Sequence, residues 1–240
     1  MEIQVFYITS IYFLLGAIGI IFINRKAGDS AARWKKFFVY ALVVYGTENA
    51  IYSERPFPYL CAAVLLAGAN ELIFVWRWHP QRKLITLFSG LLIFGSIGWS
   101  FFYFSVESGS LLQIFIYLVV LTFDGFSQIT GQLIGRLRFA GKISPNKTVE
   151  GSIGGLLMAM LTGFLLRDHF LLTLPALLLL ILMICTAALL GDLLASFYKR
   201  IHNVKDYSNL IPGHGGVLDR FDSFIFTGAV WWTVNYLGWI

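Results

Sequence analysis

The chain has 240 residues, of which 58% are hydrophobic and only 13% are charged, and its formal net charge is +5. A soluble domain is usually about 45–50% apolar and about 25% charged, so one small core in water could not bury this much apolar surface. The composition therefore excludes an ordinary soluble domain and indicates a membrane protein. We attribute the basic excess to cytoplasmic loops and anionic lipid rather than to nucleic acid.

Apolar stretches long enough to cross about 30 Å of hydrocarbon follow one another along the chain. They predict an all-α bundle of eight transmembrane helices, with seven as the alternative, in one membrane domain. The first stretch has no basic leader, so we expect it to be kept as a span rather than removed as a signal peptide. Cys61 and Cys185 lie inside apolar runs and are expected to be packing residues. The six strong stretches are 5–23, 57–76, 84–104, 111–131, 170–190 and 223–240, and the two weaker ones are 37–52 and 152–166.

Lys and Arg alternate between successive loops of this eight-span arrangement. The loops near 24–36, 77–83, 136–147 and 199–220 are rich in basic residues, whereas the loops between them are poor in them. Basic loops tend to remain on the cytoplasmic side, so both termini would face outward. The polar segments then face the cytoplasm, where nucleoside triphosphates are found.

The C-terminal polar cluster contains acids at the ends of two adjoining spans. On a helix over 188–200, Asp192, Ser196 and Lys199 would share one face. Asp219 and Asp222 are three residues apart and would share a face at the start of the last span. Carboxylates beside lysine and arginine suit a site for Mg²⁺ and a triphosphate. The alternative is a solvated basic loop whose acids pair with its own cations.

Between these acids lies the glycine-rich run Ile211–Val217. Gly213, Gly215 and Gly216 would allow the backbone to approach a ligand closely and to present N–H groups to phosphate. His214 lies among them, which a plain solvated loop does not explain.

Two further clusters lie earlier in the chain. In the first, Lys147, Ser144 and Thr148 can bind phosphate, and Glu150 can hold a cation, but a capped helix start explains the same residues. In the second, Asp124 and Gln128 could share a helical face with Gly131, while Gly131 and Gly135 also permit close helix packing. For this second cluster, ligand binding and packing remain equal alternatives.

The run S-x-x-K-R-x4-K-D-x-S-x2-I-P-x-H-G-G-x2-D-R-x-D, from Ser196 to Asp222, resembles the signature of the CTP:phosphatidate cytidylyltransferase (CDP-diacylglycerol synthase) family. Residues 144–151 resemble the family's S-P-x-K-T-x-E-G segment. The chain departs from the family pattern at Tyr198, Gln128, Gln132 and Arg136. The resemblance covers about residues 115–230, so residues 1–110 are expected to supply N-terminal spans and residues 111–240 the catalytic core.

This resemblance implies cytidylyl transfer from CTP to phosphatidic acid or a related lipid phosphate, giving CDP-diacylglycerol and pyrophosphate. It also implies Mg²⁺, with a second cation as an option, a homodimer, and a multi-pass protein of the cell membrane. The resemblance also implies three sets of site residues. The implied catalytic residues are Asp192, Asp219, Lys199, Ser196 and His214. The residues implied to hold substrate phosphates are Lys147, Ser144, Arg200, Lys205, Gly215, Gly216 and Arg220, and the implied metal ligands are Asp192, Asp219 and Asp222.

Two other functions fit parts of the same pattern. A CTP-dependent kinase of a polyprenol-like alcohol would transfer the γ-phosphoryl group, and an ion-coupled transporter would use intramembrane acids. The acids gather at one face rather than along a transbilayer path, which disfavours the transporter. For the cytidylyltransferase, we expect Asp219→Ala to abolish turnover and leave the fold intact.

Overall fold

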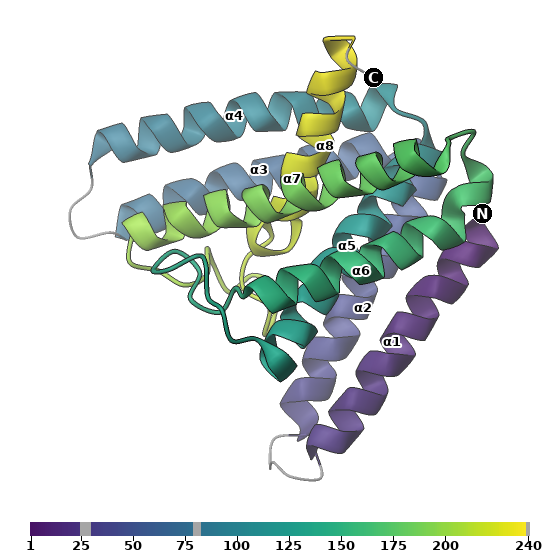
Figure 1. Ribbon diagram of the computed structural model, residues 1–240. Coiled ribbons are helices and arrows are strands. Elements are labelled where there is room, and N and C mark those ends of the chain that lie inside the picture. The colour runs from purple at the N-terminus through teal and green to yellow at the C-terminus, as the bar shows by residue number, and fades with distance from the viewer. Residues whose placement is uncertain (25–29, 79–82, 239–240) are drawn as a thin grey trace.

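The computed structural model describes residues 1–24, 30–78 and 83–238, and this part of the chain forms eight α-helices (Figure 1). A 3-10 helix, Arg167–His169, follows the sixth of them. Each of the eight predicted stretches corresponds to one helix, so the all-α class is confirmed. The helices are α1 (Glu2–Asn24), α2 (Ser30–Tyr52), α3 (Pro56–Trp78), α4 (Leu84–Glu107), α5 (Ser110–Ile134), α6 (Val149–Leu166), α7 (Leu174–Ile201) and α8 (Leu218–Tyr236).

The boundaries differ most where polar residues enter a helix. The predicted span 170–190 is α7, which continues to Ile201, so the expected helical face over 188–200 is part of this span. Likewise α8 begins at Leu218 rather than at 223. Arg25, Lys26 and Arg82, which contributed to the predicted basic loops, lie outside the described residues.

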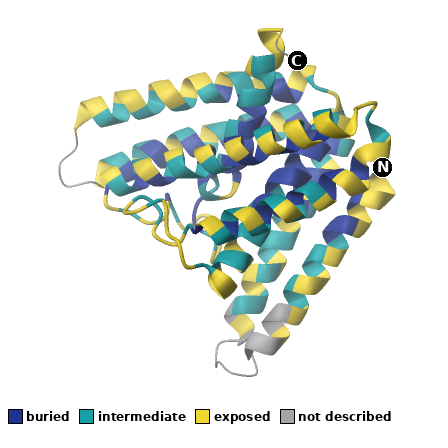
Figure 2. Cartoon of the chain, in the orientation of Figure 1, coloured by how far each residue is buried: buried dark blue, intermediate teal, exposed yellow. Residues whose placement is uncertain are grey.

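Five segments in the described part of the chain are long and apolar enough to cross a membrane: α3, α4, α5, α7 and Val149–His169. Large apolar side chains of these helices, such as Leu92 and Leu179, are exposed. Exposed residues recur along the helices (Figure 2). Such surfaces suit contact with lipid rather than water. The structure therefore agrees with a helical membrane bundle.

The core of the bundle is α5, which is buried continuously from Gln113 to Val120. It packs most extensively against α6, and glycines at the crossing allow the two backbones to approach. A Cβ atom on Gly131 would lie only 3.1 Å from the Thr148 side-chain oxygen and 3.7 Å from the Gly151 Cα. The packing role predicted for Gly131 is thus confirmed, because a larger residue would push the helices apart.

Helix α8 runs across α4 and α7 and packs against both (Figure 1). The loops 135–148 and 202–217 lie at the same end of the bundle, beside the start of α8. Arg200 Nε joins them by donating to the Ile143 carbonyl oxygen at 3.2 Å. This crossing brings the polar clusters of α7, α8 and the 135–148 loop together.

Candidate active site

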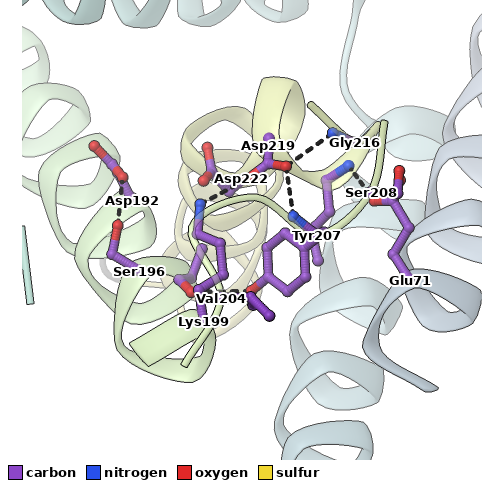
Figure 3. A network of polar contacts seen from close by, with 12 residues as sticks. Glu71, Asp192, Ser196, Lys199, Val204, Tyr207, Ser208, Gly216, Asp219 and Asp222 are labelled. Atoms are coloured by element: carbon purple, nitrogen blue, oxygen red, sulfur yellow. Dashed lines mark hydrogen bonds and ion pairs between the residues drawn. The ribbon is translucent and has the colours of Figure 1, made fainter. Parts of the chain in front are cut away.

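A buried ion pair joins the last turn of α7 to the first turn of α8. Lys199 Nζ donates to Asp219 Oδ1 at 2.6 Å, and the two side chains are only 9% and 2% exposed. The other oxygen, Asp219 Oδ2, accepts the backbone N–H groups of Tyr207 and Gly216, each at 2.8 Å (Figure 3). Both oxygens of Asp219 are therefore engaged within the protein, and the carboxylate fastens the 202–217 loop to the two helices.

The glycine-rich run forms a tight turn around this carboxylate. Ile211 N–H donates to the Gly215 carbonyl oxygen at 2.9 Å, closing the turn. Gly213 and Gly215 have φ of 78° and 84°, in the left-handed region that glycine adopts without steric cost. A Cβ atom on Gly215 would lie 2.8 Å from Asp219 Oδ2. The glycines at these positions are thus required by the turn itself, and their predicted contact with phosphate stays a prediction.

Glu71 of α3 supports the same turn from the opposite side. Its carboxylate is buried and accepts three hydrogen bonds: from Ser208 Oγ at 2.6 Å, Val217 N–H at 2.9 Å and Leu218 N–H at 2.8 Å. The N–H groups of Val217 and Leu218 are the first of α8, and such groups lack partners within the helix and attract negative charge. Glu71 is therefore the N-terminal anchor of α8 and positions Asp219 indirectly.

A second ion pair joins two predicted clusters. Lys147 Nζ lies 2.6 Å from Asp192 Oδ2, and both side chains are partly exposed. Ser196 Oγ donates to Asp192 Oδ1 at 3.2 Å, as expected for residues one helical turn apart (Figure 3). The predicted face with Asp192 and Ser196 is confirmed, whereas Lys199 at the end of α7 pairs with Asp219.

Two more carboxylates lie beside Asp192. Asp124 of α5 and Asp222 of α8 are each close enough to interact electrostatically with Asp192 and with each other. Lys147 partly offsets the charge around Asp124, and Lys199 that around Asp222. Acids gathered in this way are stabilised by additional positive charge.

This donor set suits Mg²⁺, which binds through one or two carboxylates and completes its coordination with phosphate oxygens and water. Among the described residues, no group of three or more acidic, histidine or cysteine side chains lies at ion-binding spacing. A site completed by substrate is consistent with that result. Of the three predicted metal ligands, Asp192 and Asp222 interact electrostatically with Asp124. Asp219 is already engaged by Lys199 and two N–H groups. The metal assignment itself stays a prediction.

His214 projects from the turn toward α2. Its ring stacks on Tyr40, with centroids 5.6 Å apart and the planes inclined by 15°. Burial lowers the pKa of His214, and the charges of Arg220 and Lys36 lower it further. His214 Nδ1 is buried and has no hydrogen-bond partner among the described residues. Helix α2 thus supplies a wall of the site, with a cation and a phenol near the glycine turn.

The family model described as "Cytidylyltransferase family" matches residues 2–237, which is nearly the whole chain. The chain belongs to this cytidylyltransferase family. A protein called phosphatidate cytidylyltransferase from Rickettsia bellii is 33% identical over 200 residues, covering 78% of this chain and 84% of the relative. Proteins of the same name from Staphylococcus haemolyticus and Bacillus subtilis are 40% identical over 132 and 137 residues, covering 54% of this chain. The match spans about half the length, 51%, of each of these two relatives.

The remaining residues of the family-like segments lie in the 135–148 and 202–217 loops or directly after the ion-paired residues Lys199 and Asp219. Arg200 is partly buried and donates to the carbonyl oxygens of Ile143 and Val204, so it supports the loops. Lys205 and Arg220 are exposed, and Ser144 is half-buried. Their predicted contacts with phosphate stay predictions.

The S-P-x-K-T-x-E-G segment begins a helix, as the alternative interpretation had it. Thr148 Oγ1 accepts the N–H of Gly151 at 3.1 Å and caps α6. Glu150 accepts the backbone N–H of Arg136 at 3.0 Å and that of Leu137. Lys147, immediately before the cap, is the member of this segment that reaches the acids.

From the sequence, Glu71 could line a lipid head-group cavity or form hydrogen bonds between helices, and neither Tyr40 nor Lys36 was assigned to the site. An acid within an otherwise apolar stretch was a signal for Glu71, because such acids are costly unless they have partners. Its partners lie 137 to 147 residues further along the chain, so only the fold identifies them. For Tyr40 and Lys36, the sequence offered no comparable signal.

Proposed function

We propose that this chain transfers the cytidylyl group of CTP to phosphatidate, giving CDP-diacylglycerol and pyrophosphate. The observation that carries the proposal is an ion pair between two separate polar clusters, with acids of two further helices close enough to interact with it electrostatically. The Lys147–Asp192 pair joins the 144–151 segment to α7, and Asp124 and Asp222 interact electrostatically with Asp192. The names of the similar proteins support the same reaction.

In this reaction an ionised oxygen of the lipid phosphate attacks the α-phosphorus of CTP. A new P–O bond forms, the bond between the α-phosphorus and its bridging oxygen breaks, and pyrophosphate leaves with both electrons of that bond. The attacking oxygen is already ionised, so the site needs no strong general base. Catalysis then depends on in-line positioning and charge neutralisation.

The basic side chains would perform this neutralisation. Lys147 is partly exposed and can exchange the Asp192 carboxylate for a phosphate oxygen. Arg220, at the surface beside His214, can hold a second phosphate. Lys199 remains with Asp219 and holds the frame in which these groups act.

Asp192 and Asp222, with Asp124 beside them, would hold Mg²⁺, and the metal would neutralise charge at the transferred phosphorus. The electrostatic interaction of these three acids with one another supports this assignment. Ser196 would keep the Asp192 carboxylate oriented through its hydrogen bond.

We further propose that all eight helices span the cell membrane and that the site faces the cytoplasm. The alternation of basic and non-basic loops supports this orientation. Residues 1–110 would then act as supporting spans, although Glu71 and Tyr40 reach the site from them. A homodimer is expected from the family resemblance.

Products made by the purified chain test the proposal. Given phosphatidate, Mg²⁺ and CTP in detergent, the chain is expected to release pyrophosphate and form CDP-diacylglycerol. Formation of CDP and a phosphorylated lipid alcohol would identify a lipid kinase instead. Glu71→Gln keeps a hydrogen-bond acceptor at the start of α8, so this variant should be partly active and can be compared with the wild type in the same assay.

A further inference from the structure

An apolar cleft of about 170 Å³ opens between α4 and α7, with α3 and α8 forming its floor. Both walls pack against α8, and the cleft occupies the space that remains between them. Ser89, Gly90 and Ile93 line it from α4, and Leu194 and Tyr198 line it from α7. Since α4 and α7 are both long and apolar enough to span a membrane, the mouth of the cleft would face hydrocarbon.

Some residues that line the cleft are about half exposed and others are buried. At the mouth, Ile93 is 48% and Phe197 49% exposed, whereas Tyr207 and Leu218 on the floor are 2% and 4% exposed. A groove of this kind buries an apolar chain that enters from the side. Head groups and water-soluble molecules have few polar partners along its walls.

The floor of the cleft reaches the acids of the candidate site. Asp222, which interacts electrostatically with Asp192 and Asp124, is one of its lining residues. Tyr207, another lining residue, donates its N–H to Asp219. A molecule with an apolar chain in the cleft would therefore have its polar end beside the carboxylates.

Tyr198 crosses the cleft and is held in place at both ends. Its Oη donates to the Leu72 carbonyl oxygen at 3.3 Å. Its ring covers Gly90 so closely that a Cβ atom there would lie 2.5 Å from the ring. Tyr198 is also one of the positions at which the chain departs from the family pattern.

We infer that this cleft binds one acyl chain of the lipid phosphate substrate and that Tyr198 limits how that chain lies. The inference rests on the proposed function. The expected occupant is a substrate lipid rather than bulk lipid because the cleft is continuous with the charged site. Tyr198→Ala should widen the cleft beside Gly90 and weaken discrimination between acyl chains of different shape.

Binding can be tested without turnover, with the full chain in nanodiscs and a phosphatidate whose acyl chain carries a diazirine. We expect cross-links to cleft residues of α4 and α7, suppressed by unlabelled phosphatidate and not by phosphatidylcholine. Equal labelling by a phosphatidylcholine probe of the same chain would overturn the inference in favour of bulk lipid. Cross-links only outside the cleft, or a product linking two copies of the chain through it, would also overturn it.

Adjacent residues on α4 provide a matched kinetic pair. Ile93→Trp fills the cleft and should raise the KM for phosphatidate about tenfold, the factor expected when about two methylenes lose burial. Leu92→Trp, on the outward face, should stay within about twofold of the wild type. Equal effects of the two variants would contradict the inference. If the chain is labelled in the cleft as expected but forms no CDP-diacylglycerol, only the proposed function is contradicted. If the chain is active but is not labelled in the cleft, only the inference about the cleft is contradicted.

Discussion

Lys199 of α7 and Asp219 of α8 form an ion pair at 2.6 Å that is almost completely removed from solvent. The pair lies where the acids of two helices and the glycine-rich turn meet, and Asp219 also holds two N–H groups of that turn. A carboxylate with this many partners organises the site before any substrate arrives. Its loss should therefore change the fold locally as well as the chemistry.

Asp219→Ala would leave the Lys199 ammonium buried without its partner. Removing one member of a buried pair costs about 3–5 kcal/mol, so we expect a marked fall in the free energy of unfolding together with loss of turnover. The sequence alone predicted loss of turnover with the fold intact, and the burial of the pair adds the expected loss of stability. Thermal unfolding in detergent measures the effect.

The double variant Lys199→Met with Asp219→Asn separates the two effects. It removes both charges and keeps a side-chain oxygen for the N–H groups of Tyr207 and Gly216, so it should restore much of the stability without restoring turnover. Recovered activity in this double variant would show that the pair serves only the fold.

Glu71→Ala removes the acceptor for the first N–H groups of α8. Hydrogen bonds to a charged group contribute about 1.5–3 kcal/mol, so stability should fall by that order. The turn that carries Gly216 should also shift, and kcat should fall by about tenfold or more because small misplacements are costly. Glu71→Gln should recover part of both.

Asn70→Ala is the matched control for Glu71, because Asn70 is its neighbour on α3 and makes one exposed hydrogen bond to the Leu66 carbonyl oxygen. This control is expected to leave stability and kcat near those of the wild type. If it matched Glu71→Ala, the anchoring role of Glu71 would be wrong.

Removing divalent cations with a chelator should abolish turnover, and Mg²⁺ should restore it. Asp192→Asn keeps the shape of the side chain but loses its charge, so the Mg²⁺ concentration for half-maximal activity should rise about tenfold or more. Asp168→Asn, in the exposed 3-10 helix, should leave the Mg²⁺ dependence unchanged. An unchanged Mg²⁺ requirement in Asp192→Asn would remove Asp192 from the metal site.

The lowered pKa of His214 makes a prediction about stability at low pH. Its usual value is 6.5, and burial together with Arg220 and Lys36 lowers it in the folded protein. The unfolded chain then binds this proton more tightly, so stability falls as pH decreases below the unfolded value. We expect His214→Gln to lose less stability than the wild type between about pH 7.5 and about pH 5.5.

Thermal unfolding at the two pH values measures this difference. Identical pH dependence in His214→Gln and the wild type would mean that His214 is solvated like a free side chain.

The helices could be predicted from the sequence because lipid-spanning segments are long, apolar and local. The contact of Ser196 with Asp192 was also accessible, since residues four apart on a helix face the same way. The capped start of α6 at Thr148 was one of two interpretations, and cap chemistry is likewise local.

The pairing of charges could not be predicted in the same way. Lys147 contacts Asp192, 45 residues away, and Glu71 contacts Leu218, 147 residues away, because of how α3, α7 and α8 cross. The sequence predicted that Lys199 shares a helical face with Asp192. In the structure, the 202–217 loop brings Asp219 back to Lys199, and these two residues pair. No local feature of the sequence distinguishes an acid that binds a metal from an acid that pairs with a lysine.

The most direct test uses CTP labelled separately at the α- and the γ-phosphorus, with the purified chain, phosphatidate and Mg²⁺. We predict that the α label enters the lipid while the γ label leaves as pyrophosphate. With Asp219→Ala, neither label should move. Entry of the γ label into a lipid alcohol supplied in parallel, or no transfer of either label to any lipid, would contradict it.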